Sequence, residues 1–331
     1  MSASKTHNGD TPIEVDPSNN NNNDAPGADD ETSSFTASLT STVLDYPYEN
    51  GRRYHAYQQG KYVLPNDEQE TKRLDMSHHM MTLLMDEKLH LAPIGANPKR
   101  VLDIGTGTGI WCVEMGDRYP SAEILGNDLS AVQPSAVPPN VRFEIDDVED
   151  DWAFPQPFDY IHSRYMAASI ADWPRLVKRC FDNTSPGGWV EFQDYDPSYR
   201  CDDGSLKPDH AVARWIKLIT QACHEVGRDP SPGPQLEGWV RDAGFTEIHS
   251  HTFKIPIGRW PKNPRLKTVG AWDLLQILEG LEGFSMALFT RTLKWTAEEV
   301  QVLLSKVRED LKNPAIHTYT NFHVVYARKP T

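Results

Sequence analysis

The chain has 331 residues, of which 38% are apolar, and a formal net charge of −14 at pH 7. It contains no run of 18 apolar residues, and its first residues lack the basic and apolar parts of a signal peptide. We therefore expect an intracellular protein without a membrane span, in the cytoplasm or the nucleus. The acidic balance opposes contact with phosphate backbones and argues against direct nucleic-acid binding. The four cysteines are widely spaced, a pattern that favours neither a metal site nor a disulfide framework.

Residues 1–44 are predicted to form a disordered tail. They include an asparagine run at 19–23 and carry seven acidic residues against one lysine. Such a composition buries too little apolar surface to offset the entropy lost on ordering. Deleting residues 1–40 is therefore expected to leave the thermal stability of the protein nearly unchanged.

Residues 45–98 are predicted to be an N-terminal extension with one long helix. Asn66 is the expected N-cap, and the apolar stripe that follows predicts a helix to about Leu89. His78 and His79 are adjacent, so they cannot share a helix face, and we expect solvated or capping histidines instead of a metal pair. The tyrosines at the start of the extension either pin it onto the core or help to roof a ligand pocket.

The segment 101–111, Val-Leu-Asp-Ile-Gly-Thr-Gly-Thr-Gly-Ile-Trp, carries the strongest signal in the chain. Its first residues predict a short buried strand, and a helix is expected to begin near Ile110. Three glycines at alternate positions between them allow a tight turn and a close approach of the backbone to a ligand. The pattern is typical of a nucleotide-like cofactor site.

The spacing discriminates between cofactors. A dinucleotide fingerprint requires a small residue where Ile110 stands, and a P-loop requires a Lys-Ser/Thr pair that is missing after the glycines. Asp103, at the end of the strand, would repel a pyrophosphate but can orient an ammonium group. S-adenosylmethionine has that ammonium group and no phosphate, so it is the predicted cofactor, and a nicotinamide-dependent oxidoreductase is the less favoured alternative. The predicted binding residues of this loop are Asp103, Gly105, Thr106, Gly107 and Gly109.

Two further strand ends supply candidate cofactor contacts. Asp128, with Leu129 beside it, ends the second predicted strand and can accept hydrogen bonds from ribose hydroxyls; the alternative is an N-cap of the next helix. After the third strand, Asp147, or else Asp146, can accept from an adenine amino group, with Val148 packing beside the ring. The extension at 45–98 is expected to cover this cofactor site.

Candidate catalytic groups follow the fourth and fifth predicted strands. Because ligands of open α/β sheets lie beyond the carboxyl ends of the strands, His162, Arg164 and Tyr165 are expected near the reacting methyl group. Asp194, at the end of the fifth strand, is a further candidate. His162 is the candidate general base and an additional cofactor contact, and Asp194 is the alternative base. An ordinary strand-end histidine explains His162 as well. Two more strands complete a seven-stranded pattern, with insertions at about 196–234 and 258–316.

Several sequence blocks together resemble the fungal LaeA-like methyltransferases over roughly residues 46–330. The blocks are Glu-Asn-Gly-Arg-Arg-Tyr-His at 49–55, Leu-Pro-Asn-Asp-Glu-Gln-Glu at 64–70, Gly-Thr-Gly-Ile-Trp at 107–111, Gly-Asn-Asp-Leu-Ser at 126–130, Gln-Pro at 133–134, Cys-Asp-Asp-Gly-Ser-Leu at 201–206, Asp-Ala-Gly-Phe at 242–245 and Ala-Arg-Lys-Pro at 327–330. The sequence departs from the family at Thr106, where members often carry cysteine. This conservative change leaves the glycine pattern intact.

The resemblance implies a Rossmann-like seven-stranded class I methyltransferase domain at residues 99–331, with helical insertions and the N-terminal helical extension. It also implies two alternative roles. One is an S-adenosylmethionine-dependent enzyme that methylates a small-molecule, peptide-like or protein acceptor in fungal secondary metabolism. The other is a nuclear regulatory subunit that acts through velvet-type protein partners, with little or no turnover.

Overall fold

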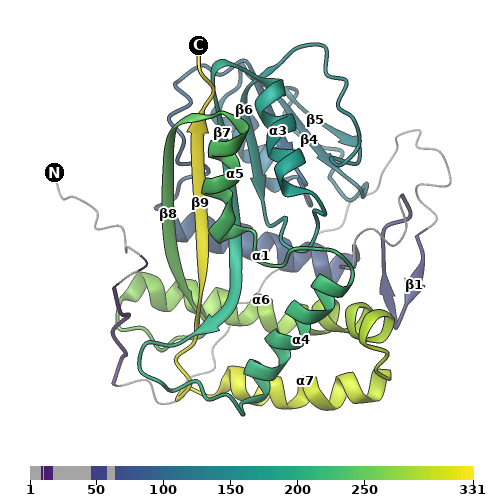
Figure 1. The fold of residues 1–331 in the computed structure, drawn as a ribbon, viewed down its shortest axis with the longest axis vertical. Helices are drawn as coiled ribbons and strands as arrows, with labels where there is room; N and C mark the ends of the chain where they lie inside the picture. The colour runs from purple at the N-terminus through teal and green to yellow at the C-terminus, as the bar shows by residue number, and fades with distance from the viewer. Residues whose placement is uncertain (1–8, 10, 18–45, 58–63) are drawn as a thin grey trace.

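A seven-stranded sheet forms the centre of the protein (Figure 1). The computed structural model describes residue 9 and residues 11–17, 46–57 and 64–331. The strands of the sheet are β3 (Arg100–Ile104), β4 (Glu123–Asp128), β5 (Val141–Ile145), β6 (Phe158–Arg164), β7 (Thr184–Arg200), β8 (Thr246–Pro256) and β9 (Tyr319–Arg328). A separate hairpin pairs β1 (Tyr48–Glu49) with β2 (Arg52–Arg53).

The strand order is β5-β4-β3-β6-β7-β9-β8. Strands β3 to β7 are parallel, whereas β9 is antiparallel to both β7 and β8. This arrangement confirms the predicted seven-stranded α/β sheet. Successive strands are added outward from β3 to β5, and the chain then returns to place β6 on the other side of β3. The carboxyl ends of β3 and β6 therefore flank the topological switch point, where sheets of this type bind ligands.

Helices cover both faces of the sheet. On one face, α2 (Ile110–Arg118) buries Trp111 and Met115 against β3 and β4. On the other face, α3 (Trp173–Asn183) packs against β7, and α5 (Leu236–Ala243) packs against β8 and β9. Gly109 is the N-cap of α2, at the start that the sequence predicted, and Gly244, in the αL conformation, ends α5.

The two predicted insertions supply a helical layer below the carboxyl end of the sheet (Figure 1). It contains α4 (Ala211–Glu225), α6 (Pro264–Leu288), the π-helical turn η2 (Phe289–Leu293) and α7 (Ala297–Lys312); a 3₁₀ turn, η1 (Gly233–Gln235), precedes α5. Thr296 and Glu299 form a capping box at the start of α7. The long helix α6 packs against α1 (Glu68–Leu84) of the extension, so the extension and the insertions form one wall.

The extension differs from the sequence expectation at its helix. Asp67, not Asn66, caps α1 by accepting the N–H of Glu70, and the helix ends at Leu84 instead of Leu89. The side chain of Asn66 instead donates to Ser130 Oγ, over 3.2 Å. That hydrogen bond joins the extension to the loop that follows β4.

The prediction of a disordered tail differs from the structure at residues 11–17. Ile13 is buried in a small cluster with Trp260 and Tyr319, and Val15 pairs with Pro261 in an isolated bridge. Two apolar residues on alternate positions are enough to dock this short piece, although the average composition of the first 44 residues is polar. The rest of the predicted tail lies outside the described residues.

Candidate functional site

The glycine loop between β3 and α2 has the backbone that the sequence predicted. Gly105, Gly107 and Gly109 all have positive φ, at 65°, 57° and 79°, a region that side-chain-bearing residues rarely adopt. A Cβ on Gly105 would lie 2.3 Å from the sulfur of Met166, and one on Gly109 would lie 2.5 Å from Phe143. Conformation and close packing therefore both require glycine here.

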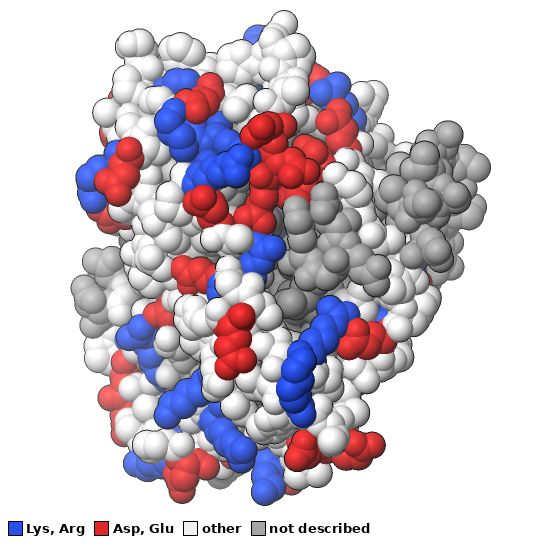
Figure 2. Space-filling view, turned by 45° about the vertical axis from the view of Figure 1, so that its right-hand side comes forward, with Lys and Arg blue, Asp and Glu red and all other residues white. Residues whose placement is uncertain are grey.

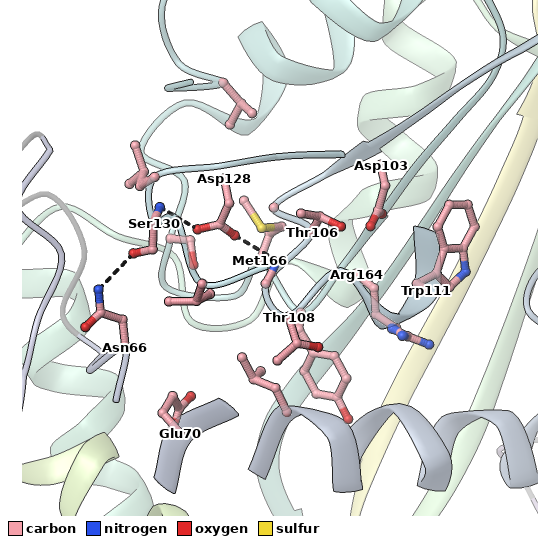
Figure 3. A pocket seen from close by; sticks show the side chains of 18 of the residues that line it. Asn66, Glu70, Asp103, Thr106, Thr108, Trp111, Asp128, Ser130, Arg164 and Met166 are labelled. Atoms are coloured by element: carbon pink, nitrogen blue, oxygen red, sulfur yellow. Dashed lines mark hydrogen bonds between the residues drawn. The ribbon is translucent and has the colours of Figure 1, made fainter. Parts of the chain in front are cut away.

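A cavity of about 140 Å³ lies between this loop, the carboxyl ends of β3, β4 and β6, and helix α1 (Figure 3). Its walls include ten of the eleven predicted cofactor residues: Asp103, Gly105, Thr106, Gly107, Asp128, Leu129, Asp146, Asp147, Val148 and His162. Gly109 does not line the cavity, since it begins α2 and packs on Phe143. The sequence thus placed residues from four strand ends at one cavity, and α1 closes the side opposite the loop.

Asp128 is held in a fixed orientation at the end of β4. One carboxylate oxygen accepts the N–H of Gly107 and the other that of Ser130, each at 2.9 Å (Figure 3). Desolvation by the surrounding protein raises the pKa of Asp128 to about 6, although these N–H groups act in the opposite direction. The carboxylate thus stands in the cavity wall, already oriented by the glycine loop.

Asp103 and His162 lie on neighbouring strands in direct register. Nδ1 of His162 is 2.7 Å from Oδ1 of Asp103, and the imidazole stacks on Trp111 with ring centroids 4.0 Å apart. Only 1% of His162 is exposed. The imidazole therefore orients Asp103 and is itself immobilised, which is the geometry of a positioning residue more than of a mobile general base.

Asp194 does not line this cavity. Its carboxylate accepts the backbone N–H groups of Met166, Ala167 and Tyr195. Burial raises its pKa to about 7, against the effect of these N–H donors. In the structure the Asp194 side chain braces the loop that follows β6, and its role as a catalytic base stays a prediction.

Sequence reasoning did not anticipate the partnership of Arg164 and His78. Arg164, at the end of β6, donates from Nη2 to Nδ1 of His78 over 2.6 Å, and the other ring nitrogen of His78 is 3.2 Å from Glu114. Burial lowers the pKa of His78, which favours the neutral ring that such an acceptor requires. The expectation that His78 is solvated or capping is wrong, because the ring faces inward from α1 with 3% exposed.

Arg164 brings a positive charge to a cavity that otherwise contains several carboxylates. Its Nη1 is buried and has no hydrogen-bond partner among the described residues. Figure 3 shows Arg164 beside Trp111, on the side of the cavity away from Asp128. A buried guanidinium with a spare donor fits a carboxylate-bearing ligand.

A second cavity, of about 190 Å³, lies between β7 and the helices α1, α4 and α6. Most of its lining is apolar. It shares Leu74 and Tyr165 with the first cavity, so the two spaces adjoin. Together they provide one polar compartment at the glycine loop and one apolar compartment under the helical layer.

Comparisons with known proteins agree with this geometry. Residues 76–250 match the family described as "Methyltransferase domain". The chain is 49% identical over 308 residues to methyltransferase pytC of Aspergillus terreus, covering 93% of this chain and 94% of that protein. It is 36% identical to the secondary metabolism regulator LAE1 of Cochliobolus heterostrophus, over 88% and 99% of the two chains. It is 38% identical to the protein-methionine methyltransferase laeA of Emericella nidulans, over 85% and 76%.

The chain therefore belongs to the methyltransferase-domain family and has the class I methyltransferase fold. The predicted methyl donor, S-adenosylmethionine, agrees with membership of this family. Within that class the chain is of the LaeA-like type, which confirms the resemblance seen in the sequence. Among the described residues, no helix is both long enough and apolar enough to cross a membrane.

Proposed function

We propose that this protein transfers the methyl group of S-adenosylmethionine to a small-molecule acceptor of fungal secondary metabolism. The observation that carries the proposal is the apolar cavity that adjoins the glycine-loop cavity at Leu74 and Tyr165. A methyl donor and an acceptor can be bound side by side there. The higher identity to pytC than to the LaeA relatives reported above supports an enzymatic role.

The residues of the first cavity suit the parts of the donor. The glycine loop permits close backbone approach, and Asp128 offers oriented acceptors to ribose hydroxyls. Asp147 or Asp146 would accept from the adenine amino group, with Val148 beside the ring. Arg164 would bind the carboxylate of the amino-acid moiety. When bound, the donor supplies an electrophilic methyl group.

The protein's own contribution is orientation and exclusion of water. Transfer from a sulfonium requires no nucleophilic residue, and well-oriented reactants reach effective molarities of about 10⁵–10⁸ M. His162 supports this by holding Asp103, and Asp194 supports it by holding the Met166 loop against Gly105. A separate general base is not needed for an acceptor that is already nucleophilic.

A second candidate function is regulatory. Relatives of 36–38% identity are named secondary metabolism regulators, and the family resemblance implies a velvet-type partner in the nucleus. In that role the chain would contact proteins and not nucleic acid. On the face seen in Figure 2, lysine and arginine side chains are interspersed with acidic ones, a distribution that suits proteins better than phosphate backbones.

Deletion of the gene in its fungal host, followed by untargeted mass spectrometry of metabolites, tests the proposal. We expect loss of one methylated metabolite and accumulation of its precursor, lighter by one CH₂. Wild-type protein should restore the product, and the Asp128→Ala variant should not. Broad changes in many unrelated metabolites that Asp128→Ala restores as well as wild type would reject the proposal and favour the regulatory role.

A further inference from the structure

The second cavity has the size and lining of a small-molecule site. Its volume of about 190 Å³ exceeds the roughly 150 Å³ of a buried cavity that accepts benzene. Side chains such as Trp215, Ile277 and Phe284 give it an apolar wall from α4 and α6. A largely apolar molecule of about the size of two fused rings fits this space better than a chain of a macromolecule.

One carboxylate interrupts the apolar wall. Asp273, on α6, is only 1% exposed, and its Oδ1 accepts a 2.8 Å hydrogen bond from Gln276 Nε2. Its Oδ2 is buried and has no hydrogen-bond partner among the described residues. Thr320 on β9 also lines the cavity, and its Oγ1 is likewise buried without such a partner in the described structure. Buried polar atoms of this kind are costly unless a ligand completes their hydrogen bonds.

The nearest positive charge does not donate a hydrogen bond to Oδ2 of Asp273. Arg73, on α1, donates to both carboxylate oxygens of Glu70, at 2.7 and 2.9 Å, and to Gln276 Oε1 at 2.8 Å. Its charge is therefore compensated by Glu70, next to it on the helix. The hydroxyls of Tyr165 and Tyr195 are also engaged with each other, at 2.9 Å. Asp273 lines the cavity, and its Oδ2 thus remains an acceptor without a hydrogen-bond partner among the described residues.

We propose that the second cavity binds the methyl acceptor, an uncharged and largely apolar small molecule whose hydroxyl or N–H group donates a hydrogen bond to Oδ2 of Asp273. This inference rests on the proposed function for the identity of the ligand as the acceptor. Asp273 acts as a specificity-determining residue: it fixes the orientation of the molecule, while the apolar wall supplies most of the affinity. The binding event itself needs no donor cofactor and is measured separately.

Two probes isolate the hydrogen bond. 2-Naphthol and 2-methylnaphthalene have the same ring system and substituents of similar size, but only the naphthol has a donor. The naphthol preference is the dissociation constant of 2-methylnaphthalene divided by that of 2-naphthol, measured by fluorescence titration at pH 8. We expect this ratio to be at least tenfold higher in wild type than in Asp273→Leu. Asp310→Asn is the matched control, because Asp310 caps α4 from α7 and lies outside both cavities.

A second variant keeps the test informative if Asp273→Leu does not fold. In Asp273→Asn, the Gln276 amide still requires an acceptor, so the new amide N–H₂ turns toward the cavity. It can donate to the naphthol oxygen but cannot accept from the hydroxyl, so the charge-assisted hydrogen bond is lost and the naphthol preference falls. Both variants are expected to melt cooperatively and to bind S-adenosylhomocysteine as wild type does. Wild type that fails to bind 2-naphthol at millimolar concentration, or an unchanged ratio in a folded Asp273 variant, would overturn the inference.

The same titrations separate this inference from the proposed function. If wild type binds S-adenosylhomocysteine but the ratio does not depend on Asp273, the acceptor assignment fails and the methyltransferase proposal stands. If the ratio depends on Asp273 but no donor cofactor binds, the cavity remains a ligand site and its role as a methyl-acceptor site is refuted.

Discussion

Asp128→Ala separates cofactor binding from stability. The carboxylate accepts two backbone N–H groups and stands in the wall of the first cavity. Its pKa is about 6 in the fold against an ordinary 3.8, so above pH 7 the fold disfavours the ionised group by about 3 kcal/mol. For an acid with a raised pKa, stability is fully present below the ordinary pKa and is lost as the pH rises through about 6.

Removal of this carboxylate should therefore not weaken the fold at pH 8. The cost of ionising Asp128 in the fold, about 3 kcal/mol, already includes its hydrogen bonds from the two backbone N–H groups. In the alanine variant, those N–H groups can donate to water in the cavity instead. We expect the free energy of unfolding to stay the same or to rise. Cofactor affinity should fall, because a hydrogen bond to a charged group contributes about 1.5–3 kcal/mol, which corresponds to roughly 10–150-fold.

Calorimetry with S-adenosylhomocysteine at pH 8 measures the affinity, and urea unfolding at the same pH measures the stability. Asp117→Ala is the control, since Asp117 is an exposed carboxylate near the end of α2, outside the cavity. Affinity of Asp128→Ala within twofold of wild type would refute the assignment of Asp128 to the ribose. A large loss of stability together with the loss of affinity would refute the argument that the carboxylate is retained for binding.

Three further predictions follow from local geometry. Gly109→Ala should lower the free energy of unfolding by about 1–3 kcal/mol in urea titrations, because its Cβ overlaps Phe143 at positive φ; an unchanged midpoint would contradict this. Ile13→Ala should cost about 2 kcal/mol, whereas a freely disordered segment would show no change. Burial raises the pKa of Asp273 to about 7, so the 2-naphthol preference should weaken as the pH falls from 8 to 6, and a flat profile would count against it. The groups that face this carboxylate are the Arg73 guanidinium and the hydroxyls of Tyr165, Tyr195 and Tyr199.

The sequence predicted best what short segments determine by themselves. The loop at 105–109 is defined by glycines that local backbone geometry demands, and the strand before it is a buried apolar run. Asp103, Asp128 and Asp147 each follow from one rule, that polar residues at the carboxyl ends of parallel strands converge. The structure brings all three to one cavity.

Contacts between distant segments were not predictable in the same way. His78 and Arg164 are 86 positions apart, and only the packing of α1 across the end of β6 brings them together. Arg164 itself was a sequence candidate, because it ends a predicted strand at the edge where ligands bind, and it lines the cavity. Nothing in the sequence identified its partner.

Asp194 and Asp273 show that the role of a single acidic residue is also hard to predict from the sequence. Both acids were visible in the sequence: Asp194 where the fifth strand was predicted to end, and Asp273 within an apolar helix. In the structure, β7 continues past Asp194 to Arg200. Their roles depend on which donors reach them: Asp194 receives three backbone N–H groups, whereas Oδ2 of Asp273 receives none from the described residues. Hydrogen-bond satisfaction of a buried group is set by tertiary structure, and a sequence pattern does not contain it.

The most direct test of the central claim is transfer of a labelled methyl group. Purified protein is incubated with methyl-labelled S-adenosylmethionine and an extract of its fungal host, and the metabolite, protein and nucleic-acid fractions are then separated. We predict label in an organic-extractable metabolite with wild type and its loss with Asp128→Ala. Label confined to protein or nucleic acid, or no transfer despite cofactor binding, would contradict the account.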